Sequence, residues 1–244
     1  NNNFANEELS QESWRYVDSY NSQEFQSKEK IKILIVGDSH SKDLFNAFIQ
    51  NINLFKNYEF LRYGDDQRKN SLWFDKNSGE KDFIKFNESK IFKQSDIIII
   101  SDYFEEEEDF DTLDMFLDMF KNKKKIILTS NSNIYNTPTK FTSIRLTLFD
   151  DFLLRNSNSK KHIDKNLNTD ERNKINNYYY ENRDIDKLNK INTQIKIYGE
   201  KHNIQILYKE DFQCDLNRKI CFGVTDEGIK SHYDYGHFTL EGAR

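Results

Sequence analysis

The stretch that decides the fold is Ile31-Lys32-Ile33-Leu34-Ile35-Val36-Gly37-Asp38-Ser39-His40. Five of its first six residues are apolar, a pattern typical of a strand that is buried on both faces of a parallel sheet. Gly37 then permits a sharp turn, and apolar residues at helical spacing predict a helix over 41–52. The stretch therefore predicts a strand, a tight turn and a helix in succession.

The same alternation of strand and helix continues along the chain. Four further apolar runs predict strands at 58–63, 96–101, 125–129 and 204–208. Apolar residues at helical spacing predict helices from about residue 81 and at 109–120, 141–154 and 185–198. Alternation of this kind predicts an α/β fold, a three-layer α/β/α sandwich around a mostly parallel sheet of about five strands.

The organisation of the chain follows from its length and local composition. With 244 residues it is long enough for a sizeable core, and we expect one catalytic domain over residues 30–244. Residues 1–29 are polar with scattered aromatics and predict a leader that packs on this domain, and residues 156–182 predict a polar helical excursion. Because the chain opens on Asn1 and holds no long apolar run, we expect the soluble piece of a longer protein.

Charge and composition exclude several partners. The 36 basic and 41 acidic residues are interspersed, so there is no basic stripe of the kind that binds nucleic acid. Only one glycine occurs in the turn after the first strand, so the glycine-rich cofactor fingerprints do not apply and no cofactor is expected. The two cysteines lack the spacing of metal ligands, and no metal site is expected.

Ser39 is the first candidate for chemistry. Ligands of a parallel α/β sheet bind at the carboxyl ends of its strands, and Ser39 follows the first strand where a helix begins. The unpaired N–H groups and the dipole of a helix start stabilise negative charge there. We therefore predict that Ser39 is a nucleophile, with Gly37 and Asp38 supporting the turn. The alternative is that Ser39 only caps the helix.

A serine nucleophile needs a base. Of five histidines, His232 and His237 follow the last strand, on a segment that we expect to return to the carboxyl edge. If the chain tightens at Gly236, Asp234 can accept a hydrogen bond from Nδ1 of His237 and leave Nε2 facing Ser39. The alternative is a surface loop that carries an unrelated aspartate and histidine.

Cys214 and Cys221 precede this pair in a loop-like stretch. Their spacing leaves two possibilities open, a pair of buried thiols or a short-range disulfide in an oxidising compartment.

These motifs together resemble the SGNH (GDSL-like) hydrolase superfamily. The resemblance is carried by Gly37-Asp38-Ser39-His40 after the first strand and by Asp234 and His237 near the end. The segment His237-Phe238-Thr239-Leu240-Glu241-Gly242-Ala243 is similar to the His-Leu-Ser-x-x-Gly-Ala pattern of SGNH domains fused to acyltransferase-3 membrane domains. The resemblance spans residues 31–244 in layout, although its specific motifs are short.

The resemblance implies an extracytoplasmic O-acyltransferase, typically an O-acetyltransferase, on the periplasmic or extracellular face of the cell envelope. It implies a glycan as acyl acceptor, a membrane acyltransferase domain upstream in the same chain as acyl supplier, and a disulfide between Cys214 and Cys221. Two alternatives use the same residues differently: a carbohydrate or lipid esterase, and a catalytically silent glycan-binding module.

The oxyanion hole departs from the family pattern. The superfamily usually offers a glycine after the second strand, where Gly64 fits, and an asparagine after the third. Here the third strand is followed by Ser101-Asp102-Tyr103, so we expect Ser101, or Asn131 after the fourth strand, to join Ser39 and Gly64 as oxyanion donors. The aromatics Trp73, Phe74 and Tyr178-Tyr179-Tyr180 predict either a sugar-stacking platform or core packing.

Overall fold

The structure is a computed structural model that describes residues 6–22, 24–64, 79–105, 107–133, 135–136, 146–156 and 167–244. It divides into two compact units. The first, which we call the sheet unit, is Val17–Asn131 with Asn189–Tyr208. The second, the disulfide unit, is Asn1–Tyr16, Ser132–Leu188 and Lys209–Arg244. Trp73, Phe74 and the part of the predicted helix before residue 146 lie outside the described residues.

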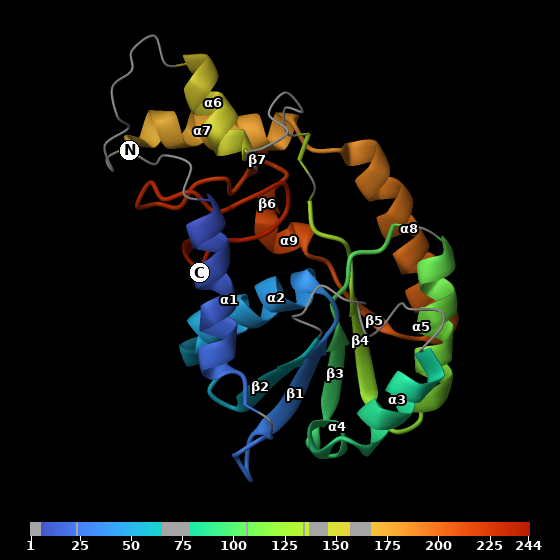
Figure 1. The fold of residues 1–244 in the computed structure, drawn as a ribbon. Helices are drawn as coiled ribbons and strands as arrows, with labels where there is room; N and C mark the ends of the chain where they lie inside the picture. Colours follow the sequence, from blue (N-terminus) through green and yellow to red (C-terminus); the bar gives the residue numbers. More distant parts are fainter. Residues whose placement is uncertain are drawn as a thin grey trace. The chain divides into compact units, whose positions relative to one another are not determined.

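The sheet unit is built around five parallel strands in the order β2-β1-β3-β4-β5 (Figure 1). The strands are β1 (Ile31–Val36), β2 (Tyr58–Tyr63), β3 (Ile97–Ile100), β4 (Lys125–Thr129) and β5 (Gln205–Leu207). All five predicted strands are confirmed to within one residue at each end. Since β1 is paired with β2 on one side and β3 on the other, the chain reverses its direction of winding there, and the end of β1 is a topological switch point.

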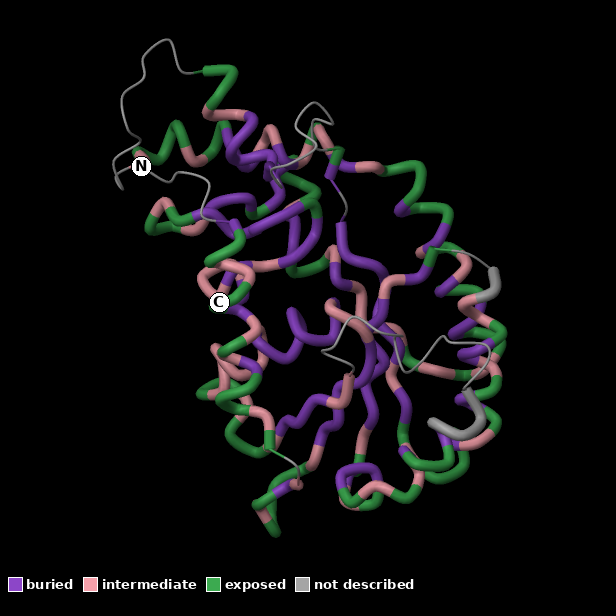
Figure 2. The backbone as a smooth tube through the Cα atoms, viewed as in Figure 1, coloured by how far each residue is buried: buried purple, intermediate pink, exposed green. Residues whose placement is uncertain are grey.

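Helices cover both faces of this sheet (Figure 1). Ile33 and Ile35 of β1 pack with Phe45 on one face, and Leu34 packs with Phe116 on the other. Strands β1 to β4 are largely buried between these layers, and the edge strand β5 is more exposed (Figure 2). On the first face lie α2 (Ser39–Gln50) and Val17, from the end of α1 (Asn6–Tyr20). The helices of the second face are α3 (Gly79–Glu88), α4 (Lys90–Gln94), α5 (Glu107–Phe120) and most of α8 (Ile185–His202). The predicted α/β/α sandwich is confirmed.

The disulfide unit has its own small core, in which Tyr135, Ile175 and Tyr179 pack against the disulfide between Cys214 and Cys221. Its elements are α6 (Leu148–Asn156), α7 (Thr169–Glu181), α9 (Glu210–Gln213), the antiparallel pair β6 (Cys214–Asp215) and β7 (Ile220–Cys221), and the 3₁₀ turn η2 (Glu241–Ala243). Helix α7 lies within the predicted polar excursion. The domain boundaries drawn from the sequence stay predictions.

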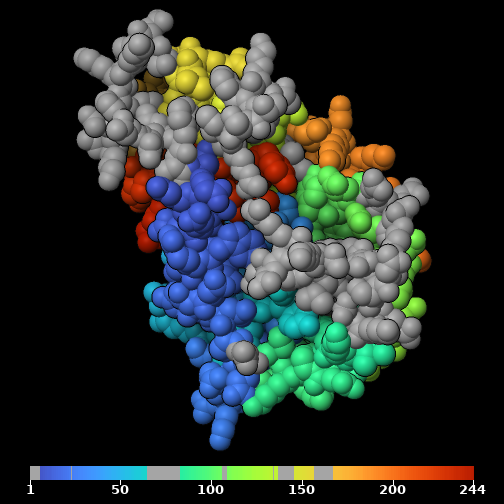
Figure 3. Space-filling view, viewed as in Figure 1, coloured from blue at the N-terminus to red at the C-terminus, as the bar shows by residue number. Residues whose placement is uncertain are grey.

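The predicted leader contains a helix, α1 (Asn6–Tyr20), whose outer side lies at the molecular surface (Figure 3). Its first residue, Asn6, is buried and donates a hydrogen bond to Asp150 at 3.0 Å. Lys230 completes this buried cluster, because its ammonium group donates to Asn6 and forms an ion pair with Asp150 at 3.1 Å. The start of α1 is thereby fixed within the disulfide unit. In the described parts of the chain, no helix combines the length and the apolar character needed to cross a bilayer.

Candidate active site

The turn after β1 places Ser39 at the first residue of α2. Asp38 is the N-cap of this helix, since its Oδ1 accepts a hydrogen bond from the backbone N–H of His40 at 2.8 Å. Capping is therefore the role of Asp38, and the alternative that Ser39 only caps the helix is wrong. Ser39 itself is half-buried at the switch point of the sheet, where the helix start favours negative charge.

Glycine is required at position 37. Its φ is +143°, and an added Cβ would lie 2.1 Å from the carbonyl oxygen of Ser101. Gly64 meets the same turn from the other side, because a Cβ there would lie 2.5 Å from the carbonyl oxygen of Gly37. The backbones that follow β1, β2 and β3 therefore approach one another closely, and the side chain of Arg62 also lies against Gly64.

Arg62 of β2 holds this turn and was missed by the sequence analysis. Its side chain is buried, its Nε donates to Oγ of Ser41 at 2.7 Å, and its Nη2 donates to the carbonyl oxygen of Asp38 at 3.1 Å. That carbonyl belongs to the peptide bond that leads into Ser39. The signal in the sequence was an arginine within a buried strand. A buried charge without a partner is costly, so such an arginine is expected to have one.

The predicted oxyanion donors Ser101 and Asn131 both bond to backbone groups in the sheet unit. The buried hydroxyl of Ser101 donates to the carbonyl oxygen of His40 at 3.3 Å. The amide of Asn131 accepts from the N–H of Phe104 at 3.0 Å and donates to its carbonyl at 2.6 Å. The bond of Ser101 uses its single hydroxyl hydrogen, and the donated bond of Asn131 uses one of its two amide hydrogens. Gly64 lies directly after β2, as expected, and the oxyanion roles of Ser39, Gly64, Ser101 and Asn131 stay predictions.

Asp234 and His237 meet as the sequence analysis expected. Nδ1 of His237 lies 3.0 Å from both carboxylate oxygens of Asp234. The turn between them is fixed by two backbone bonds, because the N–H groups of Gly236 and His237 donate to Oδ1 of Asp234 at 3.0 and 2.9 Å. Both side chains are buried. With Nδ1 facing the carboxylate, Nε2 lies on the opposite side of the ring, which is the geometry of a general base.

The environment keeps Asp234 ionised. Burial acts to raise its pKa, but the hydrogen bond and charge of His237 and the N–H groups of Gly236 and His237 outweigh it and lower the pKa. A carboxylate in this state stabilises the imidazolium that forms when His237 accepts a proton.

Two tyrosines flank His237 (Tyr233 and Tyr235). The buried ring of Tyr233 stacks on the imidazole, with centroids 5.7 Å apart and an interplanar angle of 9°. The ring of Tyr235 contacts the imidazole edge-on at 5.8 Å and is exposed. The imidazole thus has one buried aromatic neighbour and one that faces solvent.

His232 has a different character from His237. It is buried and stacks on Tyr179, with Phe238 as a further ring neighbour. Burial is the main cause that lowers its pKa to about 3, with His237 acting in the same direction and Asp234 against it. His232 is therefore neutral at physiological pH and belongs to the packing of the disulfide unit.

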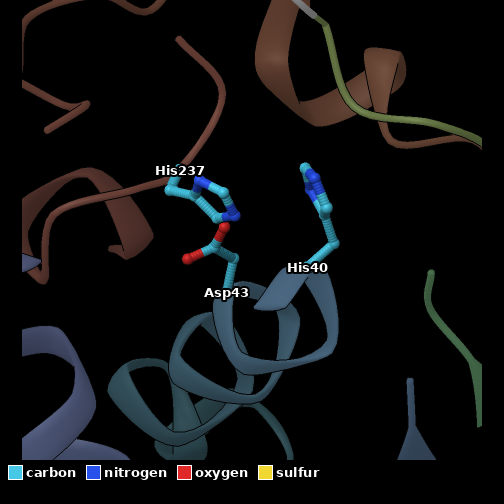
Figure 4. Close-up of side chains that lie close together, drawn as sticks. All are labelled: His40, Asp43 and His237. Atoms are coloured by element: carbon cyan, nitrogen blue, oxygen red, sulfur yellow. The ribbon is translucent and has the colours of Figure 1, made fainter. Parts of the chain in front are cut away.

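Figure 4 shows His40 and Asp43 on the first turns of α2, and His237 on the C-terminal loop. His40 is buried and stacks on Tyr103 at 5.2 Å, and Asp43 forms a buried ion pair with Lys42 at 2.5 Å. Ser39 belongs to the sheet unit and His237 to the disulfide unit. Their joint action stays a prediction from the sequence.

Comparison with known proteins finds solved structures of similar fold. No protein-family model matches the chain, and no curated protein is similar to it in sequence. Among solved structures it is similar to the periplasmic domain of a lipopolysaccharide acetyltransferase from Salmonella ser. Paratyphi A, with a TM-score of 0.61 and 14% identity over 95% of this chain and 92% of that one. The chain therefore shares the α/β fold of that periplasmic domain. A GDSL-like lipase from Bacteroides thetaiotaomicron is similar at a TM-score of 0.45, with 15% identity over 94% of this chain and 90% of that one.

Proposed function

We propose that this chain is a serine acyltransferase in which Ser39 is the nucleophile, His237 the general base and Asp234 the residue that orients it. The observation that carries the proposal is the pairing of Nδ1 of His237 with both oxygens of Asp234. A buried aspartate in this position serves to fix the tautomer and orientation of a catalytic imidazole. The place of Ser39, at a helix start on the switch point of the sheet, supports its role as the partner of that base.

The reaction has two steps. Nε2 of His237 takes the hydroxyl proton of Ser39, Oγ attacks the carbonyl carbon of an acyl ester, and the departing alcohol receives the proton from His237. In the second step an acceptor hydroxyl gives its proton to His237 and attacks the acyl-Ser39 ester. The bond between the acyl carbon and Oγ breaks, and Ser39 regains the proton. The N–H groups of Ser39 and Gly64 serve as oxyanion donors, with Ser101 and Asn131 as further candidates.

The acceptor and the setting are parts of the same proposal. The neighbour of like fold is the periplasmic domain of a lipopolysaccharide acetyltransferase, and this supports an acetyl group, a glycan acceptor and an extracytoplasmic location. The disulfide between Cys214 and Cys221 suits an oxidising compartment. A membrane acyltransferase domain upstream in the same chain would supply the acyl group.

The test uses p-nitrophenyl acetate as acyl donor and compares the wild type with Ser39→Ala. We expect release of p-nitrophenolate by the wild type and loss of nearly all of it in Ser39→Ala. Ser22→Ala is the matched control, because Ser22 is an exposed serine of the sheet unit that bonds only locally, to the carbonyl of Glu24. Release that is equal in wild type and Ser39→Ala would contradict the proposal and favour a binding module.

An esterase with the same residues differs only in the second step, where water replaces the sugar hydroxyl as acyl acceptor. With a pyranoside added, transfer of the acetyl group to the sugar supports the transferase, whereas release of free acetate alone supports the esterase. Mass spectrometry of the sugar product separates the two outcomes.

A further inference from the structure

We infer that the exposed ring of Tyr235 is a platform for the pyranose ring that carries the acceptor hydroxyl. This inference rests on the proposed function and names the acceptor-binding residue of the same site.

Tyr235 combines exposure with a fixed backbone. Its side chain is 44% exposed, although the residues on both sides, Asp234 and Gly236, are buried. Its carbonyl accepts a hydrogen bond from the N–H of Tyr135 at 3.3 Å, and the next N–H, that of Gly236, donates to Asp234 at 3.0 Å. The ring is therefore presented to solvent from a rigid turn, and little further ordering is needed for it to bind a ligand.

The ring of Tyr235 is a direct neighbour of His237, the general base of the proposed function. The centroids of the Tyr235 and His237 rings are 5.8 Å apart at an angle of 71°, so the two rings meet at an edge. An acceptor oxygen that gives its proton to Nε2 must come within about 3 Å of that nitrogen. A sugar ring that carries this hydroxyl then lies beside the imidazole, within reach of its exposed aromatic neighbour.

The two tyrosines beside His237 have different roles. Tyr233 is buried and stacks on the imidazole at 9°, so it supports the base from within the unit. Tyr235 offers an aromatic face with a polar tip. Such a face packs against the apolar C–H surface of a pyranose, while the phenol exchanges hydrogen bonds with its hydroxyls. An acyclic alcohol offers no such surface, so the ring face is the specific feature that Tyr235 recognises.

The experiment uses p-nitrophenyl acetate as donor and compares two acceptors, methyl glucopyranoside and glycerol. For Tyr235→Ala we expect the KM for methyl glucopyranoside to rise about tenfold. The KM for glycerol and the rate of acceptor-free p-nitrophenolate release are expected to change much less. Tyr235→Phe keeps the ring and is expected to stay within about threefold of the wild type. Phe212→Ala is the matched control, because Phe212 is 45% exposed on α9 of the same unit.

Three results would overturn the inference. The first is an unchanged KM for the pyranoside in Tyr235→Ala. The second is an equal loss with both acceptors, which would mean that Tyr235 acts only by positioning His237. The third is a wild type that releases p-nitrophenolate through Ser39 but transfers no acetyl group to the pyranoside.

A binding measurement separates this inference from the proposed function. Saturation-transfer NMR of methyl glucopyranoside is expected to give a signal with the wild type and with Ser39→Ala, and a weaker one with Tyr235→Ala. If catalysis through Ser39 fails but this binding pattern holds, the proposed function is wrong and the platform stands. If the signal is equal for wild type and Tyr235→Ala, the platform is wrong whatever the catalytic result.

Discussion

Nδ1 of His237 lies 3.0 Å from each carboxylate oxygen of Asp234, and the N–H of His237 donates to the same carboxylate at 2.9 Å. One aspartate thus fixes both the backbone and the ring of the histidine. The two residues are three positions apart in the sequence, so the geometry of the pair depends on a local turn. This is why a short motif can carry an accurate prediction of it.

Replacing the carboxylate tests the role of Asp234 in catalysis. In Asp234→Asn an amide faces Nδ1, and the imidazole is no longer held in the tautomer that presents a basic Nε2. We expect the rate of p-nitrophenyl acetate hydrolysis to fall by about 10⁴-fold, as in other enzymes with this arrangement. A change of less than about tenfold would mean that Asp234 does not orient the catalytic base.

The same variant has a predicted pH dependence of stability. The pKa of Asp234 is lowered in the folded protein from 3.8, so its ionised form stabilises the fold above that value, and this stabilisation is lost as pH falls through the lower folded-state pKa. The excess free energy of unfolding of the wild type over Asp234→Asn is therefore expected to shrink as pH falls below about 4. Urea titrations at pH 5 and at lower pH measure it, and a gap that stays constant or widens below pH 4 would be inconsistent with the pairing.

Arg62 and Ser41 are expected to act as a unit. Nε of Arg62 donates to Oγ of Ser41 at 2.7 Å in a buried setting, so removal of either partner breaks a buried hydrogen bond to a charged group. A double-mutant cycle of Arg62→Ala and Ser41→Ala is expected to give a coupling energy of about 1–2 kcal/mol in the free energy of unfolding. Additive effects would show that the arginine does not hold the turn.

Gly37→Ala should be far more damaging than a glycine substitution elsewhere. The change combines a φ of +143° with a Cβ placed 2.1 Å from the carbonyl oxygen of Ser101, and we expect it to cost about 3 kcal/mol or more. Gly228→Ala is the control, because its φ is +80° but its nearest contact is an ordinary 3.5 Å. There we expect a cost of about 1 kcal/mol. Chemical denaturation of both variants compares them, and equal costs would refute the close approach at Gly37.

The disulfide closes a short loop between Cys214 and Cys221, which are seven residues apart. From loop length, we expect Cys214→Ser with Cys221→Ser to lower the free energy of unfolding by about 2.5 kcal/mol. Dithiothreitol should lower the stability of the wild type similarly and leave the double variant unchanged. A wild type insensitive to dithiothreitol would argue that the bond does not stabilise the fold.

The sheet was predictable because its signal is local. The runs Ile31–Val36 and Tyr58–Tyr63 are rich in apolar and aromatic residues, and a glycine follows each of them. Helix α1 was not predictable in this way. Its buried positions include Asn6 and Ser13 beside Val17, so a search for apolar residues at helical spacing does not detect it.

The same distinction between local and long-range contacts applies to the candidate site. Asp234 and His237 are three residues apart, and their contact could be predicted from the turn between them. Arg62 could not be assigned a role, because its partner Ser41 is 21 residues away and only the pairing of β1 with β2 brings the two together. The capping role of Asp38, by contrast, depends on the next residues alone, although the sequence analysis considered only Ser39 as a cap and gave Asp38 a supporting role in the turn.

The central claim is that Ser39 is an activated nucleophile, and covalent labelling with a fluorophosphonate probe tests it most directly. The probe forms a stable adduct only with a serine whose hydroxyl is activated by a base. We predict one adduct per chain, located by peptide mass spectrometry on Ser39, absent in Ser39→Ala and strongly slowed in His237→Ala. An intact wild-type protein that takes up no probe, or takes it up equally in Ser39→Ala, would contradict the account.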